Sequence, residues 1–98
     1  MKVDFELSDR DQILANIKKA MGGRQLSKMV DFDMQSGEMV VTISKLGKSK
    51  LVFSEKTNDK GLTYTLSKEK IAFAHKAFKD DVTDKIIGVI EQAGGTVS

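Results

Sequence analysis

Cysteine is absent from this chain of 98 residues, and histidine occurs only once, at His75. Without cysteine the chain has no disulfide framework, no thiolate nucleophile and no cysteine-based metal site. A single histidine also excludes a metal site built from several histidines of one chain. We therefore predict no catalytic, cofactor-binding or metal-ligating residues, and we expect a protein that is not an enzyme.

Long apolar runs are missing as well. No stretch approaches the roughly 20 apolar residues that a membrane-spanning helix needs. The start of the sequence, MKVDFELSDRDQ, lacks the apolar segment of a signal peptide. These two absences predict a cytoplasmic protein with no membrane span.

The length and composition are those of one ordinary globular domain, covering residues 1–98, with 40% apolar and 31% charged residues. The net charge of +2 is distributed unevenly along the chain. Residues 1–44 carry a net charge of −1, residues 45–79 carry +6 and residues 80–98 carry −3. The basic middle is either a surface for an anionic partner or a set of solvated hairpin ends, where lysine discourages association between strands.

Apolar and polar residues alternate in five segments, with the period of two that is typical of half-buried strands. The predicted strands are Lys2–Leu7, Gln25–Met34, Glu38–Leu46, Ser49–Lys56 and Leu62–Leu66. In the first segment Val3, Phe5 and Leu7 share the face that we expect to be buried. Short polar or glycine-containing turns separate the last four strands, which predicts a meander of consecutive hairpins.

A first helix is predicted between the first two strands. Ser8 is expected to cap it, because a hydroxyl at that position can accept hydrogen bonds from the backbone N–H groups of the first turn. Ile13 and Ile17 belong to its apolar stripe, and Gly22 and Gly23 are expected to end it.

The longest helical pattern lies in Ile71–Ala93, where apolar residues recur at steps of three and four. Asp80 and Asp81 have the chemistry of a helix start, because the N-terminal turn favours negative charge. We therefore predict a short segment near Ile71–Phe78, either helical or extended, followed by a helix from about Val82 to Ala93.

The element order β-α-β-β-β-β-α predicts an α+β fold. The first strand can close beside the fifth, which gives a curved five-stranded antiparallel sheet of order 2-3-4-5-1 with both helices on one face. This is the topology of the TBP-like and helix-grip folds. The second helix would then cover the sheet, and the space beneath it would be either packed core or a pocket.

Two candidate binding surfaces follow from this arrangement. The first is an anion-binding patch on the hairpin ends, formed by Lys45, Lys48, Lys50, Lys56 and Lys60. The second is an apolar pocket between helix and sheet, lined by Phe32, Phe53, Tyr64, Phe78, Ile86 and Val89. Sparse arginine and the lack of an evident exposed aromatic platform speak against nucleic-acid recognition. Core packing is the alternative interpretation of the apolar set.

The C-terminal third reads AFAHKAFKDDVTDKIIGVIEQ over residues 72–92. A phenylalanine leads into an Ala-Phe-Lys step and an amphipathic helix, at Phe73, Ala77, Phe78, Lys79, Val82 and Ile86. This segment resembles the C-terminal segment of the polyhydroxyalkanoic acid system family, and the chain length and element order are also similar. The resemblance implies a small bacterial α+β protein associated with storage granules, and it supplies no catalytic residues to carry over.

The sequence thus favours a small non-enzymatic binding or interaction protein that self-associates or holds an apolar ligand. The apolar edge strand around Val30–Met34 is where a homodimer would form. One alternative is an electrostatic nucleic-acid-binding module that uses the basic hairpins of Lys45–Lys60. The other is the granule-associated protein that the family resemblance implies.

Overall fold

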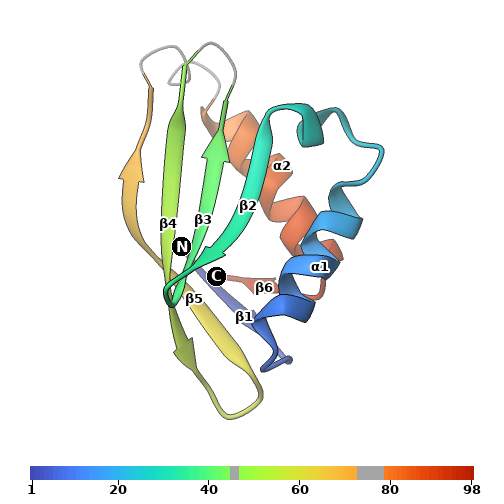
Figure 1. Cartoon of the computed structure of the whole chain (residues 1–98), viewed down its shortest axis with the longest axis vertical. Coiled ribbons are helices and arrows are strands. Elements are labelled where there is room, and N and C mark those ends of the chain that lie inside the picture. Colours follow the sequence, from blue (N-terminus) through green and yellow to red (C-terminus); the bar gives the residue numbers. More distant parts are fainter. Residues whose placement is uncertain (45–46, 73–78) are drawn as a thin grey trace.

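The computed structural model of the chain describes residues 1–44, 47–72 and 79–98. Figure 1 shows a sheet with two helices beside it. The elements in chain order are β1 (Lys2–Phe5), α1 (Arg10–Met21), the 3₁₀ turn η1 (Gln25–Lys28), β2 (Val30–Gln35), β3 (Glu38–Ile43), β4 (Ser49–Thr57), β5 (Leu62–Lys70), α2 (Lys79–Gln92) and β6 (Thr96–Val97).

The sheet has the order β2-β3-β4-β5-β1-β6, and every neighbouring pair of strands is antiparallel. This confirms the α+β class and the predicted order of the first five strands. The sixth strand was not expected, because two residues are too few for an alternation pattern. It forms because Gly94, with φ of 101°, reverses the chain after α2 and brings Val97 opposite Val3.

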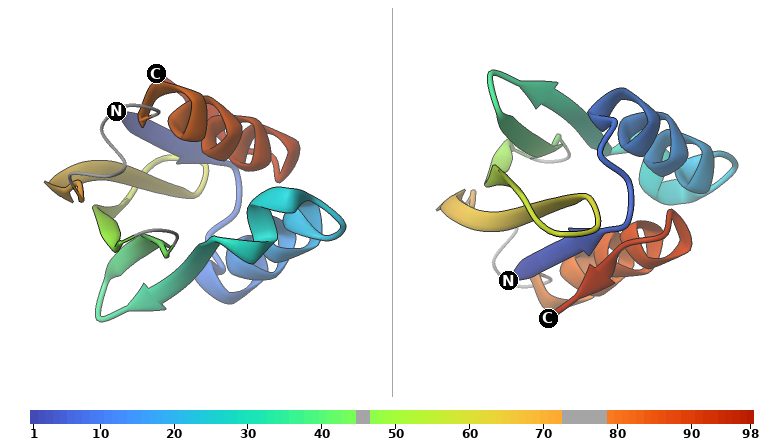
Figure 2. Two further views of the ribbon diagram at one scale, coloured as in Figure 1. Left: turned by 90° about the horizontal axis from the view of Figure 1, so that it is seen from above. Right: turned by 90° about the horizontal axis from the view of Figure 1, so that it is seen from below.

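Both helices cover the same face of the sheet, as the sequence predicts, and the sheet curves around them (Figure 2). The strands turn alternate side chains toward the helices, and these inward residues form one apolar core with the buried stripes of α1 and α2. Its fully buried members are Val3, Phe5, Ile13, Ile17, Phe32, Met39, Val41, Phe53, Tyr64, Ile86, Val89 and Ile90. Neither of the two described α-helices has the length and apolar character that a membrane span requires.

The start of α1 differs from the prediction. Asp9, and not Ser8, is the N-cap, and its carboxylate Oδ1 accepts hydrogen bonds from the backbone N–H groups of Asp11 at 3.0 Å and Gln12 at 3.3 Å. Strand β1 ends at Phe5, so Leu7 has left the sheet and is 38% exposed. The prediction that Leu7 shares the buried face of Val3 was therefore wrong.

Two other boundaries also differ. The segment predicted to begin a strand at Gln25 forms η1, because Leu26 turns into the core and the hydroxyl of Ser27 donates to the carbonyl of Arg24 at 2.7 Å. Strand β5 continues to Lys70, past the predicted end at Leu66. The last four residues of β5 are all polar, so they show no alternation of apolar and polar side chains. A register shift beside Val52 and Phe53 also interrupts the pairing of β4 with β5.

Helix α2 begins at Lys79, three residues before the predicted Val82, and ends at Gln92. Asp80 and Asp81 lie in its first turn, where the helix dipole favours them. Ile71 and Ala72 belong to no helix or strand. The rest of the segment that was expected to be helical or extended lies outside the described residues, as does Leu46, the predicted end of the third strand.

Gly61 lies very close to the backbone of β1 and of the residues that follow it. The carboxamide oxygen of Asn58 accepts from the backbone N–H groups of Lys60 and Gly61, both at 2.7 Å, and this turn presses Gly61 against β1. A Cβ atom added to Gly61 would lie 2.3 Å from the carbonyl oxygen of Phe5 and 2.6 Å from the backbone nitrogen of Leu7. Only glycine fits there without a backbone shift.

We predict that Gly61→Ala lowers the free energy of unfolding by about 2 kcal/mol or more, because two strands must separate to admit the methyl group. The matched control is Gly88→Ala. Gly88 lies inside α2, and a Cβ there would meet nothing within 4 Å, so this variant should gain about 0.5–1 kcal/mol from the higher helix propensity of alanine. Urea denaturation of both variants measures the difference, and equal stabilities would contradict the close approach.

Candidate functional site

Five of the six residues predicted to line an apolar pocket are described, namely Phe32, Phe53, Tyr64, Ile86 and Val89. Each is at most 1% exposed and belongs to the hydrophobic core. The sixth, Phe78, lies outside the described residues. The hollows described below are lined by other residues, so these five side chains pack the core, and an apolar pocket among them remains a prediction.

The predicted lysine patch is distributed over both ends of β4. Lys48 and Lys50 lie at its start, whereas Lys56 and Lys60 lie at or beyond its far end, and all four are exposed. Lys56 follows Lys50 by six steps along the strand, a distance of about 20 Å. Lys45 lies outside the described residues. The structure therefore does not bring these four lysines into one patch.

The fold instead places two lysines of β5 near the start of β4. Lys70 lies directly opposite Lys50, and Lys68 lies opposite Val52, two residues further along β4. All three lysines are exposed. This pairing was not foreseen because the prediction ended the fifth strand at Leu66.

Strand β2 forms one edge of the sheet, as expected for Val30–Met34. The carboxylate of Asp33 protects part of that edge, because its Oδ1 accepts from the backbone N–H of Met34 at 2.9 Å. Its Oδ2 accepts from the side-chain amide of Gln35 at 2.7 Å. An amide already bonded in this way is less available to a strand of a second chain. Dimerisation through this edge remains a prediction.

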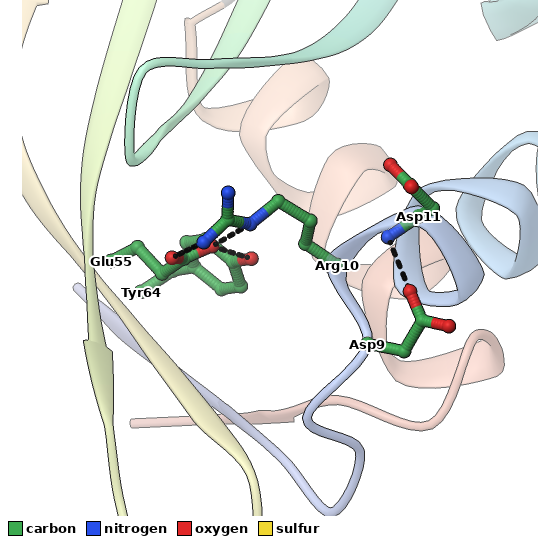
Figure 3. A network of polar contacts seen from close by, with 5 residues as sticks. All are labelled: Asp9, Arg10, Asp11, Glu55 and Tyr64. Atoms are coloured by element: carbon green, nitrogen blue, oxygen red, sulfur yellow. Dashed lines mark hydrogen bonds and ion pairs between the residues drawn. The ribbon is translucent and has the colours of Figure 1, made fainter.

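A polar network joins the start of α1 to the sheet (Figure 3). The guanidinium of Arg10 donates to both carboxylate oxygens of Glu55, from Nε at 3.1 Å and from Nη2 at 2.7 Å. The hydroxyl of Tyr64 donates to Oε1 of the same carboxylate at 2.8 Å. The Glu55 side chain is only 10% exposed, so a charge that would be costly to bury is compensated by a bidentate arginine and a phenol.

This network has a structural role. Both carboxylate oxygens of Glu55 are already engaged, so the group is not poised as a free general base. Burial raises the pKa of Tyr64 far above its ordinary value, and the hydrogen bond to Glu55 and its negative charge add to the shift, while Arg10 opposes it. The phenol therefore stays protonated and keeps donating to Glu55. The ring of Tyr64 also packs edge-on against Phe5, with centroids 6.0 Å apart.

The largest of the hollows that we describe lies between η1, the end of β3 and α2, with a volume of about 680 Å³. We call it the η1 hollow, and its lining residues are Arg24, Gln25, Leu26, Lys28, Met29, Ser44 and Lys85. A backbone hydrogen bond of 2.7 Å from Ser44 N–H to Met29 carbonyl joins β3 to the end of η1. Buried Leu26 and half-buried Met29 give the hollow an apolar part.

Three cationic residues line the η1 hollow, Arg24 and Lys28 from the η1 segment and Lys85 from α2. Its described lining contains no carboxylate. Lys85 is paired with Asp81 on its own helix at 3.3 Å, with both side chains exposed. Within the described part of the chain, neither Arg24 nor Lys28 has a carboxylate within 4.0 Å. The local charge is therefore positive and only partly compensated.

Two smaller hollows of about 370 Å³ each lie elsewhere. One is lined by Asn16, Lys19, Ala20, Gln92 and Ala93, between the C-terminal halves of the two helices. The other is lined by Asp4, Phe5, Glu6, Asn58, Asp59, Lys60 and Thr96, next to the β4–β5 loop. No group of His, Asp or Glu side chains among the described residues has the arrangement of a metal site.

Sequence reasoning did not find the η1 hollow. Lys28 falls in the segment predicted to be a strand, Arg24 directly precedes that segment, and Lys85 lies about 60 positions further along on an exposed helix face. Only the turn at η1 brings these residues to one place. A polar segment with spaced cations directly after the Gly22-Gly23 stop was the available signal.

Comparison of the chain with protein-family models, with curated proteins and with solved structures found no match. The resemblance to the polyhydroxyalkanoic acid system family therefore remains a prediction that rests on residues 72–92.

The chain contains one tyrosine, so a spectrophotometric titration reports Tyr64 alone. We predict that ionisation in the folded protein begins well above pH 10, the ordinary tyrosine value. Because the folded-state pKa is raised, the associated stability is fully present below about pH 10 and is lost as the pH rises further. Tyrosinate absorbance in native buffer and in denaturant measures the shift. Coincident titration curves would contradict the buried network.

The control for this titration is Tyr64→Phe, which removes the ionising group and its hydrogen bond to Glu55. It should lower the free energy of unfolding at neutral pH by about 1 kcal/mol and weaken the loss of stability between about pH 10 and pH 11. Denaturation curves at both pH values test this. A variant with the alkaline stability loss of the original protein would assign that loss to the lysines.

Proposed function

We propose that this protein is a small non-enzymatic binding module that takes an amphiphilic anion in the η1 hollow. The observation that carries the proposal is the combination of three cations, Arg24, Lys28 and Lys85, with an apolar part formed by Leu26 and Met29. Pockets that bind small molecules typically combine apolar lining with a few convergent polar groups. A volume of about 680 Å³ is within the usual range of such pockets.

The chemistry of the lining supports binding over catalysis. Its described side chains are cations, one amide, one thioether, one hydroxyl and one aliphatic group. The hydroxyl of Ser44 would need a neighbouring base to act as a nucleophile, and the described lining offers none. The cations can attract and hold an anion, and Met29 can adapt to apolar groups of different shape because its side chain is flexible.

We predict that anionic amphiphiles stabilise the protein. The probes are octanoate, octyl phosphate, octyl glucoside and octyltrimethylammonium, which share one chain and differ in head-group charge. At about ten times its Kd a bound probe adds about 1.4 kcal/mol of stability, which raises the Tm by several degrees. Thermal unfolding of the whole chain measures this. Two results would refute the proposal. One is that no probe shifts the Tm, and the other is that the neutral and cationic probes shift it as much as the anionic ones do.

A second candidate function rests on Lys50 and Lys70, which lie directly opposite each other on β4 and β5. Like charges in this position destabilise a sheet, and bound phosphates would offset their repulsion. With Lys48 and Lys68 nearby, this end of the hairpin supports an electrostatic nucleic-acid-binding module as the alternative. Association with storage granules, a cytoplasmic location and self-association remain predictions from the sequence.

The nucleic-acid alternative predicts binding of single-stranded or duplex DNA that weakens steeply as salt is raised. Lys50→Gln combined with Lys70→Gln should reduce the affinity and flatten the salt dependence, because two phosphate contacts are lost. Lys56→Gln combined with Lys60→Gln is the matched control at the other end of β4. Fluorescence anisotropy in low salt measures these effects, and absence of binding there would eliminate this candidate.

A further inference from the structure

Arg24 is fixed in place by two different elements. Its Nε donates to the backbone carbonyl of Ala20 in the last turn of α1 at 2.9 Å, and its Nη2 donates to the side-chain oxygen of Gln92 at the end of α2. A guanidinium has five N–H donors, so three remain after these two bonds. A side chain that is already held loses little further freedom when it binds a ligand.

The charge around the η1 hollow exceeds what a carboxylate would neutralise. Arg24, Lys28 and Lys85 each contribute one positive charge, and Asp81 offsets that of Lys85. About two positive charges remain uncompensated among the described residues. A carboxylate carries one negative charge, whereas a phosphate monoester carries about 1.5 to 2 at pH 7.

From these observations we infer that the head group held in the η1 hollow is a dianionic phosphate monoester, with Arg24 as its anchoring residue and Gln92 as the residue that positions Arg24. The inference rests on the proposed function and specifies its ligand class. The planar fork of arginine suits two oxygens of one phosphate, and Lys28 supplies a second charge from η1. The apolar group of the ligand lies against Leu26 and Met29.

A purely structural role of Arg24 accounts for only part of the arrangement. A cation near the C-terminal ends of α1 and α2 interacts favourably with both helix dipoles, and the bonds to Ala20 and Gln92 join the last turns of the two helices. It does not explain why exposed Lys28 also lines the hollow without a carboxylate partner among the described residues. The two roles therefore differ in what they predict for Lys28.

Titration calorimetry with octyl phosphate and octanoate on the full chain tests the inference, because the two probes share one chain length. At pH 8 octyl phosphate should bind about tenfold more tightly. At pH 5.5 the phosphate is largely a monoanion, since its second pKa is about 6, and the preference should fall to about threefold or less.

Three variants assign the residues. Lys28→Gln should remove most of the preference for octyl phosphate at pH 8, whereas Lys18→Gln, which removes the same charge from an exposed position of α1, should retain it. Arg24→Lys keeps the charge but loses the fork, and Gln92→Leu keeps Arg24 but releases it. Both should weaken octyl phosphate by a larger factor than octanoate. Circular dichroism confirms that each variant is folded.

The outcomes separate this inference from the proposed function. Equal affinities for octyl phosphate and octanoate at pH 8 would overturn the head-group assignment and leave the binding of amphiphilic anions intact. If neither probe bound, both the inference and the proposed function would be refuted. If Lys18→Gln and Lys28→Gln had the same effect, the preference would come from the overall charge and the assignment to the η1 hollow would fail. If Gln92→Leu had no effect, its positioning role would be lost.

Discussion

The sheet has one apolar face, and two helices must cover it. Burial of apolar surface is the main favourable contribution to folding, and here most of the buried apolar side chains lie on the side that α1 and α2 share (Figure 2). The opposite sides of the same strands carry residues such as Asp31, Lys50 and Thr63, which keep that face hydrated. The position of each helix over the apolar face is therefore the constraint on which the other features depend.

Several polar contacts hold α1 and α2 in position over the apolar face of the sheet. Asp9 fixes where α1 begins, and Arg10, the first residue of α1, reaches Glu55 on β4. At the other end Arg24 bonds to both helices through Ala20 and Gln92. The η1 hollow lies where the cover is incomplete, between η1 and α2.

The alternation of apolar residues was enough to predict the sheet order and the face that the helices cover, because a strand with one apolar side allows few arrangements. It could not predict where the elements end. Ser8 and Asp9 are both good N-caps, and which of them begins α1 depends on the end of β1 at Phe5. Strand β5 continues through Lys68 and Lys70 because β4 offers backbone partners, which no side-chain pattern reveals.

The candidate site was the less predictable part. Tyr64 was correctly expected to point inward, yet its bond to Glu55 depends on register, which places residues nine positions apart opposite each other across the hairpin. The η1 hollow depends on a 3₁₀ turn within a segment that alternates like a strand. A cluster that joins Arg24, Lys28 and Lys85 exists only after the chain has folded, and short-range patterns cannot report it.

The position of β1 has a consequence for how the chain folds. β1 lies between β5 and β6, so Val3 pairs with Tyr64 and Val97, residues distant in sequence. The hairpins of β2, β3, β4 and β5 join neighbouring segments and close short loops, whereas β1 must close long ones at a greater cost in entropy. During synthesis β1 has no partner until β5 has emerged from the ribosome. High contact order of this kind slows folding relative to a helical bundle of equal length, and the part of the apolar face that α2 covers stays exposed until that helix has been synthesised.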